Sequence, residues 1–141
     1  PYKESLWICI RRDVEWWAEN PCLYFEINPD GVHYGCFFWH PKPVKMEEFR
    51  RELARDPETF LALIDQVEKA TGVTVTAGEY KRMKPCADPR LERFYRWKGQ
   101  IGCTVHEDFS EATFGPQLGD RVRDFLLNAM PLLDYMGKFG V

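Results

Sequence analysis

A β-hairpin pattern in the first third of the chain limits the possible folds most strongly. Residues Cys22–Ile27 alternate strictly, with Leu, Phe and Ile at the odd positions and Cys, Tyr and Glu at the even ones. This period of two is typical of a half-buried strand. The next four residues, Asn28–Gly31, contain a proline preset for a turn and a glycine that adopts positive φ easily. Residues Val32–His40 continue as a second extended run, so two antiparallel strands are predicted.

Helical patterns follow this hairpin. The run Pro41–Pro43 ends the second strand, because proline cannot donate a hydrogen bond to a ladder. Apolar side chains then recur at helical spacing over residues 46–53. A second helix is predicted to begin with Asp56 as the cap and Pro57 at the first helical position, and to end at Gly72.

The rest of the chain predicts two further helices and three further strands. In chain order these are a strand at Leu6–Arg11, a strand at Val73–Ala77, a short helix from Asp88 to about Trp97, a strand at Gln100–Glu107 and a helix from about Pro116 to Met136. Pro131 is expected to kink the last helix or to end it near Met130. The segment Asp13–Asn20 fits either a helical turn or a wide loop.

The order of these elements predicts the fold class. A strand, a hairpin, two helices, a strand, a helix, a strand and a helix favour an α+β fold over a doubly wound α/β fold. We therefore expect an antiparallel or mixed β-sheet, with an N-terminal hairpin, packed against about four helices. A length of 141 residues fits one domain over residues 1–141.

Charge and cysteine content narrow the classes of partner. A net charge of −3 argues against a general nucleic-acid binder or a protein of anionic membrane surfaces. The longest apolar run, Leu6–Ile10, is far shorter than the roughly 20 residues of a membrane span. The five cysteines are odd in number and form no C-x-x-C motif. We expect reduced, mostly structural thiols and a cytoplasmic location, with Cys9, Cys22 and Cys36 buried in strands.

Several short motifs, in order, resemble the bacterial and fungal family called domain of unknown function twenty-four sixty-one. They are Pro1-Tyr2-Lys3, Phe38-Trp39-His40-Pro41-Lys42-Pro43, Phe49-Arg50, Tyr80-Lys81-Arg82-Met83-Lys84-Pro85 and Met130-Pro131-Leu132-Leu133-Asp134-Tyr135. The resemblance implies a fold and very little chemistry, since the family has no established activity. Its members usually carry a helical region before the first motif. The resemblance therefore implies that this chain is the C-terminal two-thirds of a longer family domain, although removal of an initial Met would also explain Pro1.

The segment Tyr80–Lys98 predicts an anion site. It carries seven basic and two acidic residues, a local charge of +5 in a chain of −3. Basic side chains interleaved with aromatic ones hold phosphate and stack on an attached ring. The candidate ligand-binding residues are Lys3, Lys81, Arg82, Lys84, Arg90, Arg93 and Trp97. The alternative is a solvated helix face whose arginines pair with the acidic stretch Glu107–Glu111.

Two histidines are weak candidates for acid–base catalysis. His33 and His40 are separated by an odd number, so a regular strand places them on opposite faces, where they cannot share a metal ion. His106 is followed by two acidic residues, but adjacent strand residues do not all face one way. We therefore expect no metal and no cofactor.

Aromatic residues are unusually frequent, at 15% of the chain. Those around the predicted strands either form core or line a ligand cleft. They are Trp7, Trp16, Trp17, Phe37, Phe38 and Trp39. The pattern favours core, except at Trp16 and Trp17, where adjacent residues in a polar stretch cannot both point inward and one is expected to form a lid or contact surface.

These observations predict a binding or accessory module more than an enzyme. The alternative is a small enzyme acting on a phosphate- or carboxylate-bearing substrate, with Lys3, Arg82 and Lys84 as anion clamps and His33 or His40 as the acid–base group. The expected partners are a small anionic ligand and, over exposed apolar surface, a second copy of the chain.

Overall fold

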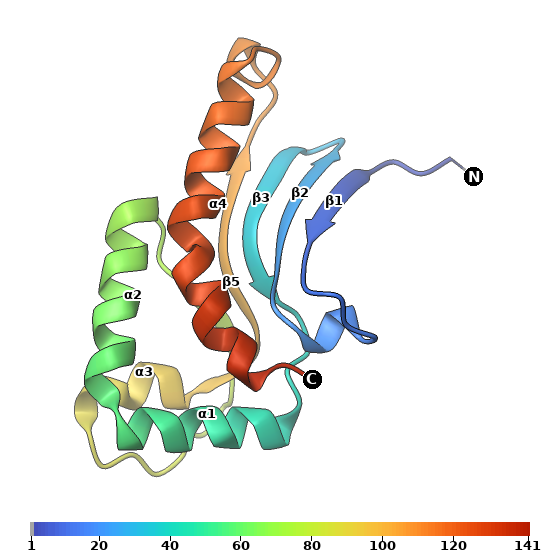
Figure 1. Ribbon diagram of the computed structural model, residues 1–141. Helices are drawn as coiled ribbons and strands as arrows, with labels where there is room; N and C mark the ends of the chain where they lie inside the picture. Colours follow the sequence, from blue (N-terminus) through green and yellow to red (C-terminus); the bar gives the residue numbers. More distant parts are fainter. Residues whose placement is uncertain (1) are drawn as a thin grey trace.

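A computed structural model describes residues 2–141 (Figure 1). Pro1, which opens the first family motif, lies outside the described residues. The strands are β1 (Leu6–Ile10), β2 (Cys22–Asn28), β3 (Gly31–Phe38), β4 (Thr76–Glu79) and β5 (Trp97–Glu107). The α-helices are α1 (Pro43–Arg55), α2 (Pro57–Thr71), α3 (Glu92–Tyr95) and α4 (Gln117–Met136). Short 3₁₀ turns are η1 (Trp17–Glu19), η2 (Pro89–Leu91), η3 (Glu111–Thr113) and η4 (Gly137–Phe139).

The strands form one antiparallel sheet in the order β1-β2-β3-β5-β4. The predicted hairpin is present as β2 and β3, whose pairing runs from Cys22 opposite Phe37 to Asn28 opposite Gly31. Helices and strands are grouped rather than strictly alternating, so the α+β class is confirmed. The sheet is the antiparallel one of the two alternatives.

The helices cover only one face of this sheet. Figure 1 shows α4 running alongside β5, with α2 on the other side of α4 and with α1 and α3 at the lower end. Side chains of β3 at alternate positions, Tyr34, Cys36 and Phe38, are buried under this layer. They join an aromatic cluster around Phe49 and Phe60, whose ring centroids are 5.3 Å apart. This cluster is the centre of the core.

Residues opposite one another in the register place a different set of side chains on the other face. Trp7, Glu26, His33 and His106 form one row across β1, β2, β3 and β5. Cys9, Tyr24, Gly35 and Thr104 form the next row. None of the four α-helices within residues 2–141 covers these rows, so this face is the one on which a solvent-accessible site can be built.

Two predicted elements differ from the structure. The strand expected at Val73–Ala77 lies slightly later, as β4. The helix expected from Asp88 to Trp97 is a 3₁₀ turn followed by α3, which ends at Tyr95. Trp97 instead begins β5 and pairs with Glu79. The pairing with β4 supplies long-range hydrogen bonds, which signals between residues close in the sequence do not reveal.

Pro131 does not end α4, which continues to Met136, so of the two predicted effects the ending near Met130 is wrong and the kink stays a prediction. A proline inside a helix removes one hydrogen bond and crowds the preceding turn. The helix continues because residues on both sides of the proline are buried against the sheet and α2, including Ala129, Leu132 and Tyr135. Tertiary packing therefore outweighs the local cost.

Candidate functional site

The structure distributes the predicted anion-binding residues over different parts of the surface. Lys3 precedes β1 at one edge of the sheet, whereas Lys81, Arg82 and Lys84 follow β4 at the opposite edge. Five strands at a spacing of about 4.8 Å separate the two edges by roughly 19 Å. Lys3 therefore cannot bind the same small anion as the Lys81–Lys84 segment.

The two arginines of the predicted site are held by carboxylates of this chain. Arg90 donates to Glu58 at 2.7 Å and to Asp88 at 2.9 Å. Arg93 donates through both terminal nitrogens to Glu68, at 3.0 and 2.8 Å. Internal pairing is thus what the structure shows for these arginines, but with other partners than the predicted stretch Glu107–Glu111.

Trp97 is a core residue. Its side chain is 1% exposed and its ring lies 5.1 Å from that of Phe94 and 6.0 Å from that of Phe49. A ring in this position cannot stack on a ligand from solvent.

The acidic residue Glu107, which was a predicted partner of these arginines, accepts hydrogen bonds from Arg121 at 2.7 Å and from the Tyr34 hydroxyl at 2.6 Å.

The two candidate catalytic histidines lie apart. His33 is in the uncovered row of the sheet, beside Glu26 and with its ring 4.5 Å from that of His106. His40 follows β3, where its backbone N–H donates to Ala18 at 2.7 Å. The structure therefore joins His33 to a second histidine rather than to His40.

A cleft of about 460 Å³ lies on the uncovered face, next to His33. We call it the aromatic cleft. Its lining consists of five aromatic residues and four smaller or polar ones: Trp7, Trp17, Tyr24, Phe37, Trp39, Ser5, Cys22, Glu26 and Thr104. It combines an apolar wall with a few convergent polar groups, which is typical of a small-molecule site.

The strand register explains how these rings come together. Cys22 lies opposite Phe37, and Tyr24 lies opposite Gly35. Gly35 has no side chain, and β5 approaches it so closely that a Cβ there would lie 2.2 Å from the Cys103 carbonyl oxygen. Alternate residues of one strand point to the same face, so Phe37 shares this face with Gly35.

Trp17 is positioned by hydrogen bonds of the neighbouring Asn20 side chain. Asn20 is nearly buried, and its side-chain amide donates to the backbone oxygens of Trp16 at 2.9 Å and of Val141 at 2.8 Å. Its amide oxygen accepts from the Val141 N–H at 3.0 Å. These bonds tie the η1 segment to the body of the protein and hold Trp17 against Trp7, with the ring centroids 6.0 Å apart.

The aromatic rings are tilted walls rather than a flat stack. The planes of Trp7 and Trp17 differ by 46°, and those of Phe37 and Trp39 by 44°. Trp7 is 56% exposed and Trp17 is 44% exposed. The prediction that these aromatic residues form core was therefore wrong for Trp7 and Trp39 and right for Phe38, whereas Trp17, which was excepted from it, is exposed as expected. Trp16 is exposed and lies outside the cleft lining.

The cleft has one charged residue in its lining, Glu26. Burial raises the pKa of Tyr24 to about 12, so its hydroxyl is neutral at physiological pH. Burial also raises the pKa of Cys22 to about 12, which keeps this thiol protonated. The described lining includes no lysine, arginine or histidine. The cleft is thus aromatic, with a single negative charge.

Cysteine positions agree with the predicted structural role in part. Cys22 and Cys36 are buried, as expected, whereas Cys9 is only partly buried. Cys9 lies in β1, an edge strand, and an edge strand has fewer neighbours to cover it. All five cysteines are free thiols.

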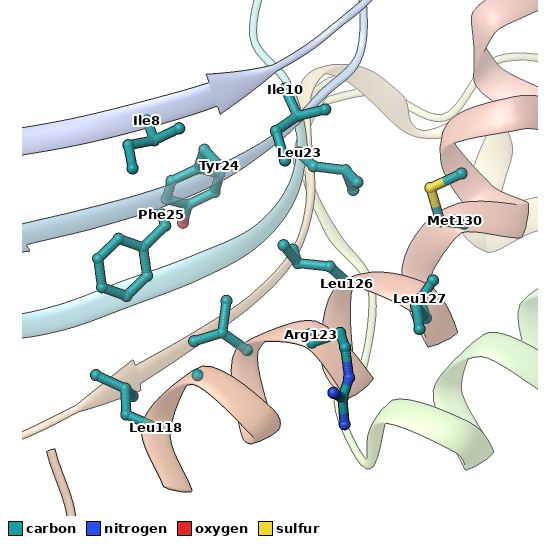
Figure 2. Close-up of a pocket in the computed structure, with 12 residues that line it drawn as sticks. Ile8, Ile10, Leu23, Tyr24, Phe25, Leu118, Arg123, Leu126, Leu127 and Met130 are labelled. Carbon is teal, nitrogen blue, oxygen red and sulfur yellow. The ribbon is translucent and has the colours of Figure 1, made fainter. Parts of the chain in front are cut away.

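A second depression lies on the other face of the sheet, between β1–β2 and α4. Figure 2 shows Ile8, Ile10, Leu23 and Phe25 facing Leu126, Leu127 and Met130 of α4 across this apolar groove. Its volume is about 540 Å³. Arg123 is the one charged residue in the lining. The groove lacks the convergent polar groups that orient a small molecule.

The described residues form neither a cluster of metal ligands nor a helix that could span a membrane. Within residues 2–141, no three His, Cys, Asp or Glu side chains are grouped so that they could hold a metal ion. None of the helices in this range combines the length and the hydrophobicity that crossing a bilayer requires.

The fold and the cleft define a small α+β domain with a ligand-sized aromatic cleft on the uncovered face of an antiparallel sheet. The family model described as "Conserved hypothetical protein (DUF2461)" matches residues 1–135, and the chain belongs to this family. The resemblance seen in the sequence motifs is confirmed. The match extends from the first residue nearly to the last and gives no support to the expectation that an N-terminal part of the family domain is missing. Neither curated proteins nor solved structures gave a match to this chain.

Proposed function

We propose that this protein is a binding module whose aromatic cleft holds an organic cation, namely an alkylated ammonium group. The observation that carries the proposal is the composition of the cleft: five aromatic rings with Glu26 as the one charged residue of the lining. The faces of aromatic rings are electron-rich and attract cations, most strongly in the case of Trp. Three of the five rings belong to tryptophan.

The tilt of the rings favours a compact cation over a flat ligand. A nucleobase stacks best on a ring face lying parallel to it, whereas neighbouring rings in the cleft are inclined by 44° to 71°. Inclined rings surround a rounded group such as trimethylammonium from several sides. Such a group has no N–H donor, so it needs no hydrogen-bond acceptor from the cleft.

Glu26 distinguishes a cation from an uncharged ligand of the same shape. Its side chain is partly exposed and accepts one long hydrogen bond, from Asn28 at 3.4 Å. The carboxylate is therefore available to a ligand in the adjacent cleft. A carboxylate beside aromatic walls repels anions, so the aromatic cleft does not fit the small anionic ligand predicted from the sequence.

A binding role is favoured over catalysis by the groups that line the cleft. Cys22 is the one thiol in the lining, and burial keeps it protonated, whereas a nucleophilic cysteine acts as the thiolate. His33 is a neighbour of Glu26 in the register but does not line the cleft. The five free thiols support work in a reducing compartment such as the cytoplasm.

The proposal is tested with choline and its uncharged isostere 3,3-dimethyl-1-butanol. We expect isothermal titration calorimetry to show binding of choline and much weaker binding of the isostere. Choline should also change the tryptophan fluorescence, since Trp7, Trp17 and Trp39 line the cleft. Failure of choline to bind at millimolar concentration, or equal binding of the isostere, would refute the proposal.

Two neighbouring tryptophans offer a matched pair of variants. Trp17→Ala removes a ring of the cleft, and loss of about 1 kcal/mol of cation–π attraction weakens choline binding about fivefold. Trp16→Ala removes an exposed ring outside the lining and should leave binding unchanged. Glu26→Gln should reduce the preference for choline over the isostere while preserving binding of both.

A further inference from the structure

A small basic pocket lies between α1 and the segment after β4, and it shares no lining residue with the aromatic cleft. Its volume is about 350 Å³. The lining consists of Glu47, Arg50, Arg51, Ala54, Lys84, Pro85 and Tyr95. Three of these residues are cationic and one is anionic, so the pocket has an excess of two positive charges.

Arg50 is the most unusual residue of this basic pocket. It is only 4% exposed, which is rare for an arginine. One terminal nitrogen donates to the backbone oxygen of Trp97 at 3.2 Å, and the other pairs with Glu47. Its Nε is buried and has no hydrogen-bond partner within residues 2–141. A buried donor without an acceptor is costly, and the residue that carries this donor lines the basic pocket.

Glu47 currently supplies the negative charge of the basic pocket. Its carboxylate accepts from Lys84 at 2.7 Å as well as from Arg50. The ion pairs with Arg50 and Lys84 lower the pKa of Glu47 to about 2. The Glu47 side chain is nevertheless 47% exposed, so it can turn into solvent and leave its place to another anion without being buried elsewhere.

We infer that this pocket binds a phosphate dianion, either as inorganic phosphate or as a phosphomonoester. Three cationic side chains attract a dianion more strongly than the single carboxylate of Glu47, and a phosphoryl group has enough acceptor oxygens for several donors at once. Lys84 and the exposed Arg51 supply charge-assisted hydrogen bonds at the mouth. Arg50 supplies the fixed guanidinium at the base, where its free Nε gains an acceptor.

The basic pocket differs in its residues from the anion site predicted from the sequence. It retains Lys84 and omits Lys81 and Arg82, which do not line the pocket. It adds Arg50 and Arg51, which lie far from Lys84 in the sequence. Because the basic pocket and the aromatic cleft share no lining residue, the phosphate site does not depend on the proposed function.

The experiment measures binding of inorganic phosphate to the full chain at low ionic strength by isothermal titration calorimetry. We expect Lys84→Ala and Arg51→Ala each to weaken binding about tenfold, the effect of losing a charged hydrogen bond. The matched control Lys81→Ala removes an exposed lysine outside the pocket and should leave the Kd unchanged. Acetate should bind more weakly than phosphate because it carries one charge.

A variant that binds phosphate more tightly is needed as well, because a loss of binding can also result from misfolding whereas a gain cannot. Glu47→Gln removes the carboxylate that competes with phosphate for Arg50 and Lys84, so this substitution should tighten phosphate binding. If phosphate bound elsewhere, the substitution would leave the Kd unchanged. Absence of phosphate binding by the unmutated protein would overturn the inference. Equal losses in Lys84→Ala and Lys81→Ala, or weaker binding by Glu47→Gln, would overturn it as well.

Discussion

Replacing Gly35 by alanine should destabilise the protein strongly, although it adds a single methyl group. Gly35 has a φ of +152°, a conformation that residues with a side chain rarely adopt. A Cβ built there would lie 2.2 Å from the Cys103 carbonyl oxygen and 2.8 Å from the Thr104 Cα. Both atoms belong to the backbone of the neighbouring strand β5, so neither can move without breaking the ladder between β3 and β5.

The expected magnitude follows from these two effects. Holding a residue with a side chain in a rare backbone conformation costs about 1–3 kcal/mol, and inserting a methyl group into filled space costs about 1–3 kcal/mol more. The free energy of unfolding should fall by about 2–6 kcal/mol. At roughly 4 °C per kcal/mol for a chain of this size, Tm falls by about 8–24 °C.

Urea denaturation followed by circular dichroism measures this loss, and other glycines provide the controls. Gly72 has a φ of +71° with no atom within 4 Å of a built Cβ, so Gly72→Ala should cost only about 1 kcal/mol. Gly119 lies in α4 with open space around it, so Gly119→Ala should stabilise by about 0.5–1 kcal/mol. A loss below 1 kcal/mol for Gly35→Ala would refute the reasoning.

Three further predictions concern the core, pH and self-association. Phe60→Ala removes a fully buried ring and should lower the free energy of unfolding by about 3–5 kcal/mol in urea denaturation; a smaller loss would contradict the placement of Phe60 in the core. Ion pairs with Arg50 and Arg121 lower the pKa values of Glu47 and Glu107 in the folded protein. Their contribution is therefore complete above the unfolded pKa of about 4.5 and is lost as the pH falls toward 2, so urea titrations should show stability declining across this range; constant stability there would disprove it. The exposed Ile8 of the apolar groove predicts self-association at high concentration, which Ile8→Lys should abolish in sedimentation equilibrium; a monomer at every concentration would exclude a homodimer through this groove.

Local signals in the sequence predicted most of the secondary structure. The turn Asn28–Gly31 and the alternation before it predicted the hairpin that β2 and β3 form. Asp56 indeed caps α2, since its side chain accepts from the Thr59 N–H at 3.3 Å. These features depend on residues within a few positions of one another, which is why one sequence is enough to find them.

Features that depend on contacts between residues far apart in the sequence could not be predicted from such local signals. Trp97 was placed at the end of the helix predicted from Asp88, but its position is set by pairing with β4 and by burial in the core. Arg93 pairs with Glu68, which lies 25 residues earlier. No local pattern indicates such a partner.

The aromatic cleft was only the less favoured of two interpretations of the sequence, for a related reason. Phe37 and Phe38 are neighbours and both strongly apolar, so the strand itself does not show which face will be covered. The position of α4 decides this: Phe38 lies beneath the helical layer, while Phe37 lies on the uncovered face. The sequence signal at this place is Gly35, two positions before Phe37, because a glycine in a strand often marks the close approach of another backbone, here that of β5.

Strand β1 connects the two open surfaces of the molecule. It lies at the edge of the sheet and pairs with β2 alone. Trp7 points into the aromatic cleft, whereas Ile8 and Ile10 point into the apolar groove on the other face. An edge strand with few buried contacts contributes least to the core and opens most easily. A cation that contacts Trp7 binds only while β1 is paired, so binding in the cleft must stabilise β1 by mass action. The same pairing fixes Ile8 and Ile10, and a ligand on one face therefore also determines how well the groove on the other face is formed.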